Sequence, residues 1–132
     1  MAYLDEWTSV KDEFEALTGL NTAAQKTWGF RKSATIDKTL KGCDHAHTAF
    51  LEHHTKEALV DLNGSFGTFS TAKAQYLFVL EAAVATDVDL RWQEKAAYER
   101  AVTLLETKLS ALEAKIRREI MEADSALSSH PS

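Results

Sequence analysis

The sequence predicts an all-α fold, a bundle of about four helices with a long amphipathic helix near the C-terminal end. Composition supports this class, because one proline and five glycines in 132 residues are too few turn formers for a β-sandwich. Alanine, leucine, glutamate and lysine, which favour helices, are abundant. The main observation is a stripe at spacings of three and four, which places its members on one helix face. The stripe consists of Val102, Leu105, Leu109, Leu112, Ile116, Ile120, Ala123 and Leu127.

The first helix is expected from about Tyr3 to Thr18, because apolar residues recur there at helical spacing. Gly19 suits the left-handed position just past a helix end. The following stretch, 19–31, leaves two alternatives open. It either holds a short separate helix or continues into the next helix with a kink.

The second helix is expected over residues 33–62, where Ser33 is a good N-cap. Gly42 inside it costs about 1 kcal/mol relative to alanine, which favours a bend or a close helix crossing. An asparagine–glycine pair then follows and is expected to end the helix. Residues 63–69 are therefore predicted to form a loop, with two aromatic side chains packed onto the core, Phe66 and Phe69.

The third helix is expected to begin near Ser70 and to reach about Thr86. It is apolar on nearly every side, so we expect it to be central and buried on nearly every side. The fourth helix is expected over 87–126, either separate from the third or continuous with it. Residues 1–127 then make a single helical-bundle domain, and 128–132 a flexible tail.

Charge and apolar patterning exclude several classes of protein. The net charge of −5 argues against nucleic-acid binding, which needs a basic surface. The N-terminal ten residues lack the pattern of a signal peptide, and the apolar run 76–85 is too short to span a bilayer. A single cysteine permits no intrachain disulfide, which suits a reducing compartment. We therefore expect a cytoplasmic protein. No motif identifies a family or a catalytic site, so we do not expect an enzyme.

The stripe of the last helix offers two alternatives. With Val102 at heptad position a, glutamates fall at e and lysines at g, namely Glu106, Glu113, Lys108 and Lys115. Such charges suit a parallel coiled coil with a second copy. Because the heptad pattern lasts for only about two and a half heptads, packing within the chain's own bundle is the alternative. Glu113 and Arg117 are also spaced for an ion pair within the helix.

Four of the five histidines lie close together and suggest a metal site. Cys43 and His47 are one helical turn apart, and His54 lies two turns further on the same face. A thiolate with imidazoles suits zinc or a similar transition metal. His53 and Glu57 repeat the one-turn spacing. The alternative is a solvent-exposed histidine patch, because no second ligand cluster exists on another expected helix.

The function expected from these patterns is a non-enzymatic helical module for protein–protein interaction or assembly, such as an adaptor or a subunit of a larger complex. The last helix would supply the partner-binding residues, for a protein partner or a homo-oligomer. These residues are Leu109, Leu112, Ile116, Ile120 and Leu127. The alternative function is a metal-binding bundle using Cys43, His47 and His54, and otherwise no cofactor is expected.

Overall fold

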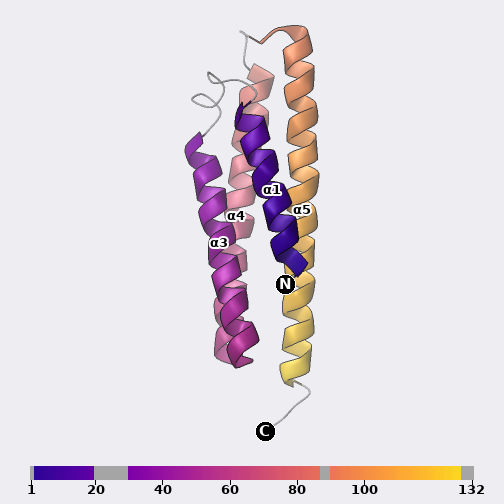
Figure 1. The fold of residues 1–132 in the computed structure, drawn as a ribbon. Helices are drawn as coiled ribbons and strands as arrows, with labels where there is room; N and C mark the ends of the chain where they lie inside the picture. The colour runs from indigo at the N-terminus through magenta and orange to yellow at the C-terminus, as the bar shows by residue number, and fades with distance from the viewer. Residues whose placement is uncertain (1, 20–29, 87–89, 129–132) are drawn as a thin grey trace.

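The computed structural model describes residues 2–19, 30–86 and 90–128, which form four helices. They are α1 (Ala2–Gly19), α3 (Phe30–His53), α4 (Lys56–Thr86) and α5 (Trp92–Ser128). The helices run alternately up and down, and α1 and α4 each pack against both α3 and α5 (Figure 1). The predicted all-α bundle with a long C-terminal helix is therefore confirmed. No helix in the described ranges is both long and apolar enough to cross a membrane. The alternatives for residues 19–31 and the predicted tail lie largely outside these ranges.

The turn between α3 and α4 corrects the predicted helix over residues 33–62. His54 adopts a left-handed conformation, with φ of 49°, and its N–H donates to the Phe50 carbonyl at 2.8 Å. Thr55 is the N-cap of α4, because its Oγ1 accepts a hydrogen bond from the Ala58 N–H at 3.1 Å. The helical pattern of side chains continues through this segment, so the pattern alone gives no sign of the break. The caps satisfy the backbone groups that the break exposes.

The predicted loop over 63–69 is also wrong, because α4 continues through Asn63 and Gly64 without a break. Phe66 and Phe69 are buried as expected, but they lie on the inner face of a helix. Burying each large apolar side chain contributes about 1.5–3 kcal/mol, whereas a glycine inside a helix costs about 1 kcal/mol. Tertiary packing therefore outweighs the local turn preference of the asparagine–glycine pair.

α4 is not buried on every side, which corrects the expectation of a central helix. Phe78 is 74% exposed and Val60 69% exposed on its outer surface. In a ring of four helices each helix keeps one face toward solvent, and α4 packs against α3 and α5. The outer face of α4 is apolar or uncharged over much of its length even though nothing in the described chain covers it.

The bundle has two apolar cores because α1 is short. The main core takes residues from all four helices, with α1 contributing Val10, Phe14 and Leu17. The second core lies at the other end and is built by α3, α4 and α5 alone. Its members are Phe50, Ala58, Leu59 and Leu62, flanked by the partly buried Ala46, Ile120, Ala123 and Leu127. With about 1.5 Å of rise per residue, α1 extends about 27 Å and α5 about 55 Å. Figure 1 shows α3, α4 and α5 continuing beyond the N-terminal end of α1.

Replacing Gly64 with alanine tests the continuity of α4. An added Cβ at Gly64 meets no atom within 4 Å, and neither does one at Gly67. Each alanine should therefore raise the free energy of unfolding by about 0.5–1 kcal/mol, by removing the entropic cost of glycine in a helix. Urea denaturation monitored by circular dichroism measures this change. A loss of stability in Gly64→Ala would instead support the loop over 63–69.

Candidate functional site

The position that a longer α1 would occupy is an open groove beside the second core. The groove has a volume of about 450 Å³ and is lined from three helices. The lining residues are His47, Phe50 and Leu51 of α3, Leu62 of α4, and Glu119, Glu122 and Ala123 of α5. We call this feature the open groove. It combines an apolar floor with carboxylates, which is the composition of a surface that receives an amphipathic helix.

A histidine–glutamate contact crosses the open groove between the two diagonal helices. His47 Nε2 lies 3.0 Å from Glu119 Oε2, and only 8% of His47 is exposed. Burial lowers the pKa of His47 below its ordinary value of 6.5, and the positive α-amino group of the chain adds to this shift, whereas the carboxylates of Glu119 and Asp44 oppose it. The imidazole is therefore mainly neutral at neutral pH. The pair then carries the net negative charge of one carboxylate into the open groove.

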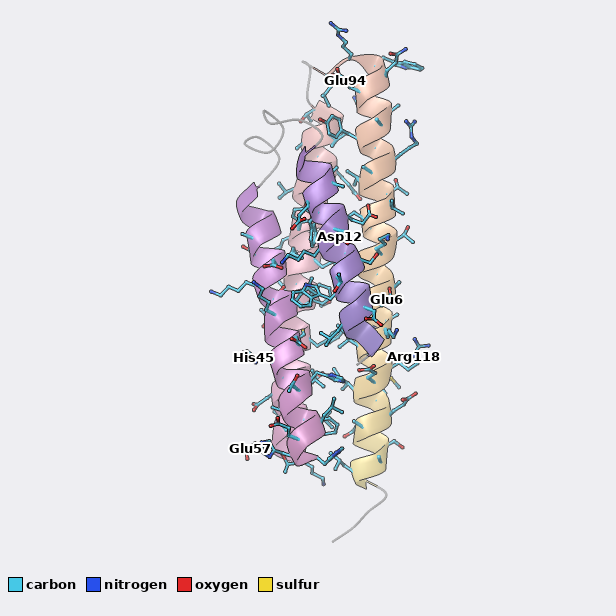
Figure 2. All side chains as sticks on the ribbon, viewed as in Figure 1. Glu6, Asp12, His45, Glu57, Glu94 and Arg118 are labelled. Carbon is cyan, nitrogen blue, oxygen red and sulfur yellow. The ribbon has the colours of Figure 1, made fainter. Side chains whose placement is uncertain are left out.

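Above the open groove, the lysines of α5 bind the acidic side of α1. Lys108 Nζ lies 2.7 Å from Ser9 Oγ and 3.3 Å from Glu13 Oε1. One heptad later, Lys115 Nζ lies 3.7 Å from Glu6 Oε1. Figure 2 shows Glu6 beside α5, near the lower end of α1. These contacts fix the register of the antiparallel pair and place the start of α1 near the level of Glu119.

A third set of charges joins α5 to α4. Lys73 Nζ and Ser70 Oγ each lie 2.9 Å from Glu113 Oε2, and Arg117 lies 3.6 Å from the other carboxylate oxygen. Burial of Glu113 raises its pKa, but the hydrogen bonds from Lys73 and Ser70 outweigh it, so the net pKa of Glu113 is lowered. The predicted pair of Glu113 with Arg117 is confirmed. The lysines and the glutamate expected to face a second copy therefore contact α1 and α4 of the same chain.

The predicted partner-binding residues divide into two groups. Leu109, Leu112 and Ile116 are fully buried in the main core, so no partner can reach them in this fold. Packing within the bundle, the alternative drawn from the sequence, accounts for these three side chains. Ile120 and Leu127 are partly buried and flank the second core. A partner-binding role for these two residues stays a prediction.

The structure does not gather the predicted metal ligands into one site. Cys43 is fully buried in the main core, and burial raises its pKa to about 12, which disfavours a metal-binding thiolate. His47 faces Glu119, and His54 lies in the turn with its ring 5.6 Å from that of Phe50. Within the described residues, no three histidine, cysteine or acidic side chains are placed to hold a metal ion.

The second predicted ligand pair is interrupted by the turn. His53 ends α3 and Glu57 lies in the first turn of α4, so they do not share a helix face as the predicted continuous helix required. Sequence reasoning also missed Glu119 and Glu122 as members of a site. The available signal was that both glutamates lie on the same face of the helix as Lys108 and Lys115, with Glu122 one heptad after Lys115. That signal can be interpreted only when the position of α1 along α5 is known.

The Cys43 thiol should react slowly in the native protein. Because the side chain is buried and its pKa is raised to about 12, both access and thiolate formation limit the reaction. Alkylation by iodoacetamide at pH 8 should be at least about 100-fold slower than in 6 M guanidinium chloride, a factor set by these two limits. Mass spectrometry of quenched samples measures both rates. Equal rates would show that Cys43 is accessible.

The His47 pair should make stability fall in mildly acidic solution. Because the folded-state pKa of His47 is lowered, the unfolded chain binds more protons as pH falls through 6.5, which favours unfolding. The Tm of the native sequence should therefore drop more between pH 7.5 and pH 5.5 than the Tm of His47→Gln. His45→Gln is the matched control, because His45 is exposed on the side of α3 away from α5 (Figure 2). Equal drops in the native protein and His47→Gln would contradict this.

The open groove thus combines apolar surface, a half-buried histidine–glutamate contact and free space. No protein family, no curated protein and no solved structure matches this chain.

Proposed function

We propose that this protein is a non-enzymatic protein–protein interaction module, an adaptor or a subunit of a larger cytoplasmic assembly, which receives a partner helix in the open groove. The observation that carries the proposal is the incomplete second core. Three helices build it, and the fourth position, which α1 occupies at the other end, is empty of any described helix. Binding a helix there would complete a four-helix arrangement along the whole bundle.

The lining of the open groove is suited to weak or moderate binding. Phe50, Leu62 and Ala123 form its apolar floor, and Leu51 stands at its edge with 43% of its surface exposed. From Glu119 to the end of α5 the available length is about ten residues, or roughly 15 Å. A partner helix of about three turns fits this length. An interface of this size is below the range of stable permanent complexes, so we expect reversible association.

Two leucines of similar exposure provide a test of this proposal. Leu51 lines the open groove, whereas Leu104 on α5 lies outside it with a similar exposure of 46%. Leu51→Ser should abolish the recovery of partners with the tagged protein from its native cells, because it removes apolar contact area. Leu104→Ser should leave the recovery unchanged. Quantitative mass spectrometry compares the two variants, and a recovered partner is then purified and titrated against each.

The proposal would be contradicted if neither replacement changed the recovery of partners, or if both replacements reduced it equally. Sedimentation equilibrium of the purified chain addresses the homo-oligomer separately. A second copy in the open groove would give a dimer that Leu51→Ser dissociates and Leu104→Ser does not. A monomer at all concentrations leaves a heterologous helix as the occupant.

A further inference from the structure

We infer that the occupant of the open groove is a basic amphipathic helix of a partner protein, with lysine or arginine facing Glu119 and Glu122. This inference rests on the proposed function, because it names the chemistry of the helix that the open groove receives. It is carried by the charges of α5, by the absence of cations in the lining and by a further carboxylate on α3.

On the side of α5 that faces α1, the charge of the side chains changes from positive to negative near the N-terminal end of α1. At 3.6 residues per turn, Lys108, Lys115, Glu119 and Glu122 fall within a sector of about 60°. The two lysines contact acidic or hydroxyl side chains of α1. The two glutamates continue the same line into the open groove. A helix in line with α1 would thus meet negative charge where α1 meets positive charge, which requires the opposite charge on that helix.

The lining of the open groove itself carries no basic side chain, although cations lie at its margins. None of the residues that line the open groove is lysine or arginine. Arg118 lies one helical turn before Glu122 and lines a neighbouring pocket together with it, and Figure 2 shows Arg118 on the side of α5 that faces away from α3. The α-amino group of the chain also acts electrostatically on His47. Lys115 contacts Glu6 of α1. His47 is mainly neutral at neutral pH because burial lowers its pKa, so it does not cancel the charge of Glu119.

Asp44 adds a third carboxylate close to the same place. It lies one turn before His47 on α3 and interacts with that imidazole electrostatically. Its Oδ1 is shielded from solvent and accepts no hydrogen bond from the described residues. Asp44 does not line the open groove, so it adds negative potential there and no direct contact for the occupant.

These features define the sequence pattern of the occupant. Its apolar residues recur at spacings of three and four over about three turns, to cover Leu51 and Ala123. Lysine or arginine residues flank this stripe at spacings that match Glu119 and Glu122. An acidic amphipathic helix would bring like charges together and be rejected.

Three synthetic helical peptides test the inference against the full-length chain. Each has 14 residues with the same leucine stripe, and the flanking positions are all lysine, all glutamine or all glutamate. Fluorescence anisotropy of the labelled peptides gives the dissociation constants. The lysine peptide should bind about tenfold or more tightly than the glutamate peptide, with the glutamine peptide between them, and added salt should reduce the difference.

Variants of the protein then locate the charge effect. Replacing both Glu119 and Glu122 with glutamine should raise the dissociation constant of the lysine peptide about fivefold, as expected for two lost charge contacts. The dissociation constant of the glutamine peptide should stay unchanged. Glu94 and Glu99, exposed near the opposite end of α5, provide the matched double replacement by glutamine. That control variant should bind the lysine peptide like the native protein.

The results separate this inference from the proposed function. Equal binding of the three peptides, weakened throughout by Leu51→Ser, would overturn the basic partner and retain the groove as a helix-binding site. A lysine preference that persists in the Glu119/Glu122 variant would also overturn it, because attraction to the acidic chain as a whole would then explain the preference. Failure of all three peptides to bind, or binding insensitive to Leu51→Ser, would count against the proposed function itself.

Discussion

The length of α1 is the constraint on which the rest of this structure depends. Its 18 residues pack against helices of 24 and 37 residues, so only one end of the bundle has four walls. Where α1 is present, one continuous core forms. Where it is absent, a smaller core is left with a groove on one side, and His47 reaches across the diagonal to Glu119. The second core, the His47–Glu119 contact and the open groove therefore all lie at the level that the described α1 does not reach.

The charged side chains of α5 determine its register against α1 and α4. Exposed and half-exposed ion pairs contribute only about 0–1 kcal/mol each, so Lys108 and Lys115 are not the main source of stability. Their effect is on register, because displacing α1 by one turn would separate both lysines from Glu13 and Glu6. Glu113 has the same effect on the other side, where Lys73 and Ser70 of α4 approach it. The apolar stripe stabilises α5 in the bundle, and these contacts decide how far along it each neighbour sits.

Helical periodicity predicted the buried face of α5 but not the surface that covers it. Leu109 and Leu112 need an apolar partner in either a coiled coil or a bundle, and spacing is identical in both. The turn at His54 was missed for a different reason. A histidine in the left-handed conformation and a threonine cap leave no glycine or proline as a signal. At Gly64 a break was expected and none is present, because the local preference of glycine for turns is weaker than the packing of the helix around it.

Residue types alone could not predict the candidate site, because the site is defined by the lack of a described neighbouring helix along part of one face of α5. His47 was singled out for its spacing from Cys43, yet the two side chains have different surroundings, the main core and the groove. Glu119 and Glu122 resemble ordinary surface glutamates until the contacts of Lys108 and Lys115 are known. The change of sign from Lys115 to Glu122, seven residues apart, then coincides with the N-terminal end of the described α1. The heptad line of α5 thus carries lysines where it contacts α1 and a glutamate where the open groove begins.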